Sequence, residues 1–255
     1  MTGDPWQLLG RARTVLAVHA HPDDESLSSG ALLAELSAAG TRVELVTATR
    51  GEEGEIVPGA VDPGDPRPLE EIREAEIDAA SAALGLAARH WLGTAPALAA
   101  DAAPRDYRDS GMQWVRPGLA GPSDGAGPDS FTRRPLEDAV ADLAALIAQV
   151  RPDVVLGYDD EGTYGHPDHV RAHEVTAAAC ARTGTPRIEV ASSDGADGGF
   201  VRRDHPETRA AVRRAIGAYR TQLTVLEDVP GGIAIRHVGG QDDVVALRTG
   251  LRRRE

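Results

Sequence analysis

Residues 14–25 read TVLAVHAHPDDE, an apolar run that passes directly into a cluster of imidazole and carboxylate side chains. The part from Thr14 to Val18 has the apolar, β-branched composition of a β-strand. Residues 153–169, DVVLGYDDEGTYGHPDH, repeat this arrangement. The sequence therefore predicts two strands that are each followed by a His-Pro-Asp turn.

Predicted strands and helices alternate along the chain. We expect strands at 14–19, 42–47, 90–92, 153–158 and 188–191, helices at 27–39, 69–84, 135–150, 168–181 and 207–219, and weak β segments at 233–238 and 244–247. Such alternation is typical of a parallel sheet covered on both faces, and 255 residues suit one domain of this kind. We therefore predict a Rossmann-like, doubly wound α/β fold with a mostly parallel sheet, helices on both faces, and a single domain spanning residues 1–255.

The stretch between residues 94 and 134 differs from the rest because it is rich in Gly, Pro, Ala and Asp. A long irregular segment inside a compact domain is typically functional or disordered. We expect residues 106–115 to be ordered and close to a site, and residues 118–129 to be mobile. The polar loop GEEGE at residues 51–55 follows the second predicted strand and has the composition of a solvated turn.

Charge and composition exclude several classes of partner. The formal net charge of −13 argues against nucleic acid and anionic membranes, and we interpret the run Arg252-Arg253-Arg254 as a frayed end. No window has the roughly 18 consecutive apolar residues of a membrane span, the N-terminus lacks a signal-peptide pattern, and one cysteine allows no internal disulfide. We therefore expect a cytoplasmic protein with a small-molecule partner, and the oligomeric state stays open. All 27 basic residues are arginine, which excludes mechanisms that need a lysine.

Both His-Pro-Asp turns follow predicted strands, so the fold decides whether they meet. In an open doubly wound sheet, ligands bind beyond the carboxyl ends of the strands where the strand order reverses. If the strands at 14–19 and 153–158 flank that reversal, their loops share one crevice, and each proline stiffens its turn. Imidazole and carboxylate groups are the ligands of catalytic zinc, which takes three from the protein. The spacing by itself does not distinguish Asp23 from Asp24 as a ligand.

These motifs resemble those of the PIG-L/LmbE family of zinc-dependent N-deacetylases, which act on N-acetylglucosaminyl groups. The stretches AHPDDE at 20–25 and GHPDH at 165–169 carry the resemblance, which spans about residues 14–180. The loop GEEGE, YRDSGM at 107–112 and the tripeptide that begins at Tyr164 resemble the mycothiol-pathway branch, whose members deacetylate N-acetylglucosaminyl-inositol. The resemblance implies a hydrolase that releases acetate and a free amine from an amino-sugar substrate, with N-acetylglucosaminyl-inositol favoured.

The resemblance also implies a metal site. By motif position, His21, Asp24 and His169 bind zinc, with ferrous iron as the alternative metal, and Asp23 is the general base. The chemistry agrees with this division, because amide hydrolysis at neutral pH needs a water nucleophile whose proton a carboxylate can take.

Three more side chains have expected catalytic roles. An acetamide nitrogen leaves well only when it is protonated, so His166 as an imidazolium is the expected general acid, with Asp168 holding its ring and raising its pKa. Tyr164 is expected to donate a hydrogen bond to the developing oxyanion. The alternative for Asp168 is that it only caps the helix that follows.

Four residues are expected, by resemblance, to bind the substrate: Arg73, Asp109, Glu53 and Met112. Arg73 has the alternative of a salt bridge within its own acidic helix. His173 lies one helical turn beyond the second motif. It has three possible roles, as a fourth metal ligand, as support for the metal site, or as an ordinary helix residue.

Two other functions are compatible with the sequence. A mycothiol S-conjugate amidase would use the same site on a larger amide. A non-catalytic metal- or nucleotide-binding α/β module is the alternative from a different class, although no Gly-x-Gly-x-x-Gly follows the first predicted strand. Metal content together with an acetate-release assay separates such a module from an enzyme.

Overall fold

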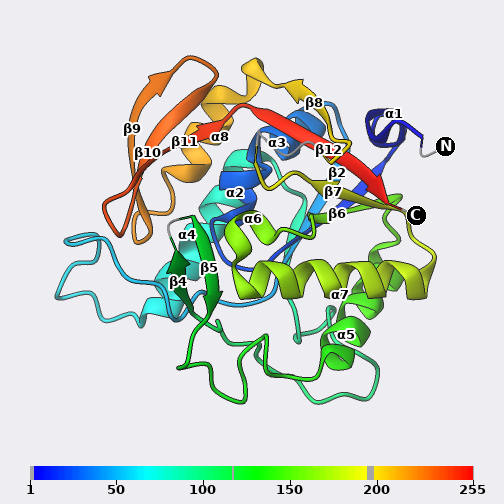
Figure 1. Ribbon diagram of the computed structural model, residues 1–255, viewed down its shortest axis with the longest axis horizontal. Helices are drawn as coiled ribbons and strands as arrows, with labels where there is room; N and C mark the ends of the chain where they lie inside the picture. The colour runs from blue at the N-terminus through cyan, green and yellow to red at the C-terminus, as the bar shows by residue number, and fades with distance from the viewer. Residues whose placement is uncertain (1–2, 117, 194–197, 255) are drawn as a thin grey trace.

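The computed structural model describes residues 3–116, 118–193 and 198–254. Figure 1 shows its helices and strands. The strands are β1 (Thr14–His19), β2 (Arg42–Thr47), β3 (Ala88–Trp91), β4 (Met112–Arg116), β5 (Leu119–Pro122), β6 (Val154–Tyr158), β7 (Arg187–Val190), β8 (Val201–Asp204), β9 (Leu223–Val229), β10 (Gly232–His237), β11 (Asp242–Ala246) and β12 (Arg248–Arg254). The helices are α1 (Pro5–Leu9), α2 (Asp24–Ser28), α3 (Gly30–Ala38), α4 (Leu69–Leu84), α5 (Leu136–Val150), α6 (Gly162–Gly165), α7 (Pro167–Thr183), α8 (Arg209–Ile216) and the 3₁₀ turn η1 (Pro206–Thr208).

The main sheet has seven strands in the order β3-β2-β1-β6-β7-β12-β8. The five strands from β3 to β7 are parallel, whereas β12 runs antiparallel to both β7 and β8. From β1 the chain moves outward through β2 and β3, and it then returns to place β6 on the other side of β1, with Val15 opposite Val154. The strand order therefore reverses between β1 and β6, and the predicted doubly wound, mostly parallel sheet is confirmed.

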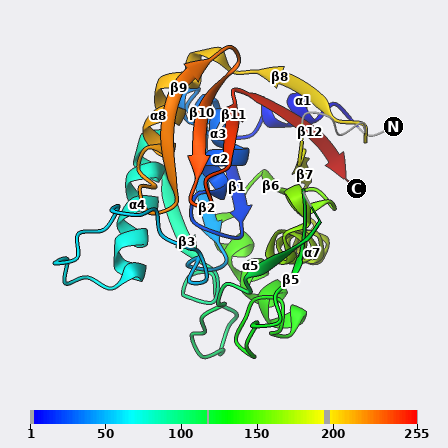
Figure 2. The same ribbon diagram turned by 60° about the vertical axis from the view of Figure 1, so that its left-hand side comes forward.

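Two apolar cores cover the two faces of this sheet, because successive residues of a strand point to opposite faces. Val15 and Ala17 of β1 pack into one core with α3, α4 and α8, and Leu16 and Val18 pack into the other with α5 and α7. Figure 2 shows these two groups of helices on opposite sides of the sheet. Burial on both faces explains why the central strands are almost wholly apolar in sequence.

The helix predicted at 27–39 is divided in two. Helix α2 ends at Ser28 and α3 begins at Gly30, because Ser29 has φ −128°. The Ser28 hydroxyl donates to the Asp24 carbonyl and the Ser29 hydroxyl donates to the Glu25 carbonyl. Side chains that bond to the preceding turn compete with regular helix geometry. The helix predicted at 207–219 is likewise shorter, since it opens as the turn η1 and α8 ends at Ile216.

Strands β4, β5, β8, β9 and β12 were not predicted, and all five have exposed or polar residues that obscure the strand pattern. Strands β9 to β11 form a separate antiparallel sheet beside α8. Strands β4 and β5 form a hairpin inside the stretch 94–134. The mobility expected for 118–129 stays a prediction, although residues 119–122 within it are paired in β5. Within the described ranges, no helix is both long and apolar enough to cross a membrane.

The interpretation of Arg252-Arg253-Arg254 as a frayed end is wrong. These residues belong to β12, where Arg252 pairs with Glu189 of β7 and Arg254 with Arg187. The Glu189 carboxylate is fully buried and accepts hydrogen bonds from Arg187, Arg252 and Arg254 at 2.7–2.9 Å. A buried carboxylate that three arginines share therefore holds β7 and β12 together, and Asp160 is a second partner of Arg252 and Arg254.

Removal of this carboxylate should destabilise the fold. In Glu189→Ala, three guanidinium groups would lose their shared buried anion, although the exposed Asp160 would remain beside Arg252 and Arg254. Breaking a buried ion pair from one side costs about 3 kcal/mol or more in free energy of unfolding. Urea denaturation measures the change. Glu137→Ala removes the partner of Arg182 in an exposed ion pair and should leave the free energy of unfolding almost unchanged. Equal effects of the two substitutions would contradict the role given to Glu189.

Candidate metal centre

The two His-Pro-Asp turns meet at the carboxyl ends of β1 and β6, the adjacent strands that flank the reversal of strand order. The first turn follows β1 and leads into α2, and the second follows the short helix α6 and opens α7. The predicted convergence of residues about 145 positions apart is thus confirmed by contacts between them, since His21 Nδ1 lies 3.3 Å from His169 Nε2. The site lies where α/β sheets commonly bind ligands.

Three side chains bring possible ligand atoms close together: His21 Nδ1, His169 Nε2 and the two carboxylate oxygens of Asp24. The distances are 3.3 Å from His21 Nδ1 to His169 Nε2, 3.3 Å from His21 Nδ1 to Asp24 Oδ2, and 3.3 Å from His169 Nε2 to Asp24 Oδ1. Zinc bonds of about 2.0–2.1 Å in tetrahedral geometry place ligand atoms about 3.3–3.4 Å apart. Each pair of these residues is therefore close enough to share a metal ion, with Asp24 facing His21 through Oδ2 and His169 through Oδ1. His166 also lies in a group with His21 and His169 that could hold a metal ion.

The proton positions also suit a metal. His169 Nδ1 lies 3.1 Å from the Thr163 hydroxyl, and when Nδ1 carries the ring proton and donates it to that hydroxyl, Nε2 is free to bind a cation. Burial raises the pKa of Asp24, but the neighbouring His169 and His21 outweigh burial and hold that pKa well below its usual value. Asp24 is therefore an ionised carboxylate, as a ligand must be.

Tyr158, the last residue of β6, supports two of these three side chains. Its hydroxyl donates to Asp24 Oδ2 at 2.6 Å and accepts from the Ala20 N–H at 3.0 Å, and its ring stacks on His169 with a centroid distance of 4.5 Å. Burial, followed by the charge of Asp24, raises the pKa of Tyr158 well above its usual value, so the hydroxyl stays a donor. Sequence reasoning missed this residue, although its position at the end of a motif-bearing strand was a usable signal.

Asp168 has a different partner from the expected one. Its Oδ2 lies 3.2 Å from His21 Nε2 and accepts from the Ser110 N–H at 2.9 Å. Asp109 Oδ1 lies 3.6 Å from the same His21 nitrogen. Burial lowers the pKa of His21, but the surrounding carboxylates, led by Asp109, raise it well above its usual value. A carboxylate on the outer nitrogen of a metal-binding histidine orients the ring and makes it a stronger ligand.

The contacts of His166 favour a neutral ring, and the Asp168 carboxylate faces His21 instead of the His166 ring. The Asp168 backbone N–H donates to His166 Nδ1 at 3.2 Å, so the proton of a neutral ring must be on Nε2. Burial, followed by the charges of His21 and His169, lowers the pKa of His166 to about 2. A nitrogen of His166 also lies within 4.8 Å of ligand-type nitrogens of His21 and His169. His166 thus presents an N–H group beside the metal ligands.

Asp23 stands next to the ligand set in a strained backbone conformation. Its φ of 106° is unusual for any residue with a side chain. Such strain persists where surrounding contacts enforce it, and it is concentrated at functional sites. Burial raises the pKa of Asp23 well above its usual value, and the charges of Asp24 and Glu25 raise it further. The raised pKa makes this carboxylate a stronger proton acceptor than a solvated aspartate.

Glu25 supplies one of the contacts that hold Asp23. Its carboxylate accepts from the Asp23 N–H at 3.3 Å, from the Ser26 hydroxyl at 2.5 Å and from the Tyr219 hydroxyl at 2.7 Å. Burial raises the pKa of Glu25 to about 7. Tyr219 follows α8, so a residue distant in sequence supports the strained turn. Neither Glu25 nor Tyr219 was identified from the sequence, because no local pattern links them.

The expected substrate-binding residues lie around this centre. Arg73 of α4 is buried, donates to the carbonyls of Gly54 and Glu55, and lies close enough to Asp23 and Asp109 for their charges to act on it. A Cβ at Gly51 or at Gly54 would lie 2.9 Å from the Arg73 guanidinium. The GEEGE loop is therefore more than a solvated turn, because its glycines leave room for this arginine.

Of the other candidates, Asp109 contacts a proposed metal ligand, whereas Glu53 and Met112 lie farther out. Asp109 is buried, accepts from the Gly111 N–H and contacts His21, as described above. Glu53 is exposed, with its Cβ 3.7 Å from the position of a Cβ at Gly111, and Met112 is half-buried at the start of β4. Glu53 and Met112 thus lie along the loop that carries Asp109.

Tyr164 and His173 complete the set of expected residues. Tyr164 is half-buried, and its ring centroid lies 5.7 Å from that of His169 and 5.9 Å from that of His166. Burial raises the pKa of Tyr164 above its usual value, so its hydroxyl is protonated. His173 bonds to the Tyr158 carbonyl through Nδ1 at 3.0 Å. That contact favours support for the metal site over ligation among the three roles left open for His173.

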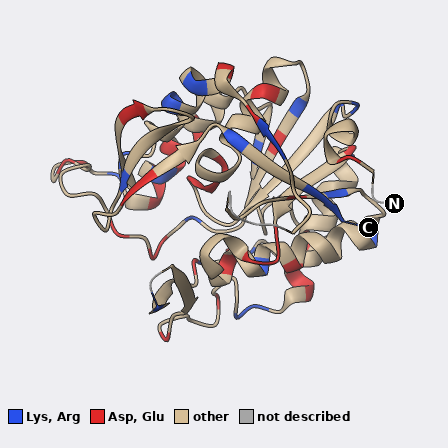
Figure 3. Ribbon diagram, turned by 45° about the horizontal axis from the view of Figure 1, so that its top comes forward, with Lys and Arg blue, Asp and Glu red and all other residues tan. Residues whose placement is uncertain are grey.

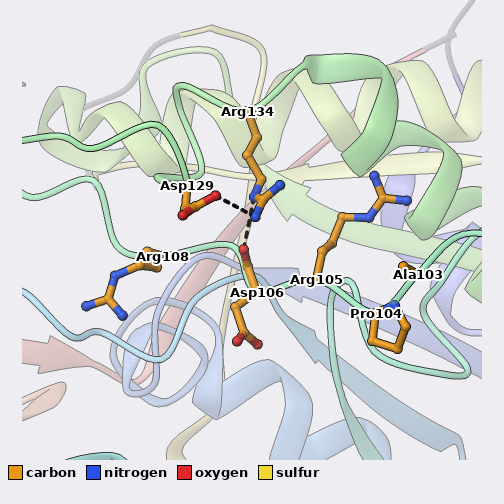
Figure 4. Close-up of a pocket in the computed structure, with 7 residues that line it drawn as sticks. All are labelled: Ala103, Pro104, Arg105, Asp106, Arg108, Asp129 and Arg134. Carbon is orange, nitrogen blue, oxygen red and sulfur yellow. Dashed lines mark hydrogen bonds and ion pairs between the residues drawn. The ribbon is translucent and has the colours of Figure 1, made fainter.

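A pocket of about 630 Å³ lies on the same loop but is not lined by the residues of the metal centre. Figure 4 shows the residues that line it: Ala103, Pro104, Arg105, Asp106, Arg108, Asp129 and Arg134. Arg134 donates to the Asp106 carbonyl and to Asp129, and Arg105 pairs with Asp138. These ion pairs stabilise the segment that leads to Asp109.

Comparison with known proteins identifies related sequences. The model of the PIG-L family, described as GlcNAc-PI de-N-acetylase, matches residues 16–180. A 1D-myo-inositol 2-acetamido-2-deoxy-alpha-D-glucopyranoside deacetylase of Kineococcus radiotolerans is 42% identical over 190 residues, which cover 74% of this chain and 48% of that protein. A protein of the same name from Thermobispora bispora is 38% identical over 236 residues, covering 86% and 70%. The chain thus spans about half the length of the first relative.

Solved structures with a similar fold are more distant in sequence. An N,N'-diacetylchitobiose deacetylase from Pyrococcus horikoshii matches with a TM-score of 0.60 and 20% identity, covering 85% of this chain and 73% of that one. A teicoplanin deacetylase in a zinc-inhibited form matches with a TM-score of 0.59 and 21% identity, covering 95% and 99%. At these identities the likeness establishes the fold.

The support that Tyr158 gives to the ligands predicts a loss of metal affinity on its removal. Tyr158→Phe deletes the hydroxyl that binds Asp24 and should weaken metal binding about 10- to 100-fold, the usual effect of removing an outer partner of a ligand. Asp24→Ala, which removes a ligand itself, should abolish tight binding. Competition with a chelating dye measures both.

Tyr107→Phe is the matched control for this measurement. The Tyr107 hydroxyl is also buried and also binds an aspartate, Asp142, but that aspartate lies outside the metal centre. The control should keep the wild-type metal affinity. A Tyr158→Phe protein with unchanged affinity would show that the hydroxyl does not position Asp24 for a metal.

Proposed function

The chain belongs to the PIG-L family, and from this premise we propose that it is a metal-dependent N-deacetylase. Its reaction is hydrolysis of the acetamide of an N-acetylglucosamine-type substrate, with release of acetate and a free amine. N-acetylglucosaminyl-inositol is the favoured substrate, since the relatives that match this chain carry the name of a deacetylase for that compound. The observation that carries the proposal is the approach of His21, Asp24 and His169 to within 3.3 Å of one another in each pair, beside the strained Asp23.

His21, Asp24 and His169 would hold the metal, for which zinc is favoured and ferrous iron is the alternative. When bound, such an ion polarises a carbonyl oxygen and lowers the pKa of water. Asp168 keeps His21 oriented through its outer nitrogen, and Tyr158 keeps Asp24 in place. We keep the cytoplasmic location as a prediction that accompanies this function.

Asp23 is the proposed proton acceptor. Its raised pKa favours uptake of the proton from the attacking water, and the same carboxyl group can then pass that proton to the departing nitrogen. This second transfer is required because neutral His166 cannot serve as a strong acid. Proton uptake and delivery by one carboxyl group balance the hydrolysis, since water supplies both the hydroxyl of acetic acid and the proton of the amine.

His166 and Tyr164 are the proposed donors to the reacting amide. His166 offers its Nε2–H and Tyr164 its hydroxyl, and both groups keep their protons across the ordinary pH range. Fixed donors aimed at developing negative charge are among the largest contributions to catalysis in a water-poor site. A neutral imidazole acts in this way as a hydrogen-bond donor rather than as an acid.

Arg73, Asp109, Glu53 and Met112 are the proposed substrate-binding residues. Arg73 and Asp109 are buried charged groups close to Asp23, so they are suited to hold hydroxyl groups of a sugar in fixed positions. Glu53 and Met112 lie farther out along the Asp109 loop, where they would contact the substrate at its periphery.

The proposed function predicts the behaviour of Asp23→Asn. This variant should bind metal as the wild type does and lose about 10²- to 10⁴-fold in kcat, because it removes the proton acceptor and keeps the ligands. Acetate release from N-acetylglucosaminyl-inositol measures kcat, and elemental analysis measures the metal. If the wild-type protein binds metal but releases no acetate from this compound or from simpler N-acetylglucosamine derivatives, the proposed function is wrong.

The neutral state of His166 predicts a particular pH dependence. Activity requires ionised Asp23, whose pKa is raised, so kcat/KM should fall as the pH decreases through a value above the usual aspartate pKa of about 4. Deprotonation of a His166 imidazolium should not produce a fall at high pH, because its pKa is already low.

Two variants separate a neutral donor from an acid at this position. His166→Gln keeps an N–H donor and should retain at least about tenfold more activity than His166→Ala, since one fixed donor contributes about 10²–10³ in kcat. Both variants should keep the shape of the wild-type pH profile. Equal loss in the two variants, with disappearance of a basic limb that the wild type possesses, would establish His166 as the general acid instead.

A further inference from the structure

The hairpin of β4 and β5 carries an exposed tryptophan close to the metal centre. Trp114 in β4 is 52% exposed, and its neighbour Val115 is 65% exposed. Large apolar side chains are usually buried, so an exposed tryptophan on the rim of a site indicates contact with a ligand. Figure 1 shows β4 and β5 beside α6, the short helix that precedes the second His-Pro-Asp turn.

Aromatic rings form a line from the metal ligands outward to this tryptophan. The ring centroid of Tyr164 lies 5.7 Å from that of His169, and the ring centroid of Trp114 lies 5.5 Å from that of Tyr164 on its other side. The planes of Trp114 and Tyr164 are tilted by 38°. Trp114 is therefore two ring contacts away from a metal ligand and next to a proposed catalytic donor.

The hairpin is attached to the site at both ends, so the position of Trp114 is defined. Met112 begins β4 directly after the loop that carries Asp109. On the other strand, Leu119 and Ala120 pack against Gly165, which precedes His166. Gly165 has φ +78°, and a Cβ at this position would lie 2.8 Å from Leu119 Cδ1. Because residue 165 is a glycine, the hairpin can pack closely against the loop that carries His166.

We infer that Trp114 is the binding platform for the second ring of the substrate, the ring attached to the amino sugar. The inference rests on the proposed function, because a reacting acetamide must lie at the metal ligands, with its own sugar ring next outward and the attached group beyond it. A partly exposed indole face suits a ring that has a C–H face and hydroxyl groups at its edge, such as a cyclitol or a pyranose. Trp114 thus selects two-ring substrates over a single amino sugar.

Comparison of a two-ring and a one-ring substrate tests this assignment. The wild type should have a higher kcat/KM for N-acetylglucosaminyl-inositol than for N-acetylglucosamine. Trp114→Ala should lower kcat/KM for the two-ring substrate about tenfold, mainly through KM, because a stacking contact is made in the ground state and the transition state alike. The value for the one-ring substrate should change by less than about twofold, so the preference should largely disappear.

Two further variants make the comparison specific. Trp114→Phe keeps an aromatic face and should retain most of the preference for the two-ring substrate. Val115→Ala removes the neighbouring exposed apolar side chain of the same strand and should leave both substrates unaffected. Equal losses on both substrates in Trp114→Ala would mean that the residue only supports Tyr164 or the hairpin, and no loss on either would exclude contact with the substrate. Both results would overturn the inference.

A fluorescence titration keeps the inference testable apart from turnover. Trp114 is the tryptophan at the site. Trp6 is buried in the core that contains α3, α4 and α8, and Trp91 ends β3. Addition of N-acetylglucosaminyl-inositol to the Asp23→Asn protein should change the tryptophan emission, and Trp114→Phe in the same background should remove that change. Failure of the proposed function would appear as absent acetate release by the wild type. Failure of the present inference would appear as an emission change that survives Trp114→Phe.

Discussion

The hydrogen bond from the Tyr158 hydroxyl to the Asp24 carboxylate joins the two halves of the site. It connects the end of β6 to the turn after β1, and the same tyrosine ring stacks on His169. It forms because β1 and β6 are adjacent parallel strands at the reversal of strand order. Parallel neighbours bring their carboxyl ends to one edge of the sheet, so the loops that follow them share one crevice. The mutual distances of 3.3 Å among the ligand atoms depend on this adjacency.

The segment that follows α8 supports the site although the family model ends at residue 180. Tyr219 donates to Glu25, whose carboxylate also binds the backbone of the strained Asp23. Two residues later, Thr221 donates from its backbone and its hydroxyl to Glu76 of α4, the helix that also carries the buried arginine of the site. The C-terminal part of the chain thus reinforces both the catalytic turn and the helix behind it. Strain at one residue is maintained here by contacts that several elements supply together.

The sequence alone was sufficient for the fold class and for the two motifs that meet at the candidate metal centre. Buried parallel strands are apolar on both faces, so β1 and β6 stand out as apolar runs, and the proline in each turn fixes the backbone locally. Local signals of this kind placed both His-Pro-Asp turns after strands, and the family resemblance supplied His21, Asp24 and His169 as the expected ligands. They failed for the strands near the C-terminus, because the arginines of β12 are charged in sequence and pair with carboxylates of other segments, above all the buried Glu189.

Contacts between distant residues were decided only by the tertiary structure. Tyr158 and Asp24 are 134 positions apart, and Tyr219 and Glu25 are 194 apart, so no spacing rule connects them. No spacing rule predicts the partners of Asp168 either. Its carboxylate contacts His21, and its backbone N–H donates to the neighbouring His166. That choice of partner sets the protonation of His166, because burial without a carboxylate partner favours the neutral ring. The sequence determined which groups could reach the site, and the packing of the sheet, loops and hairpin determined their partners, their protonation and the exposed ring at its edge.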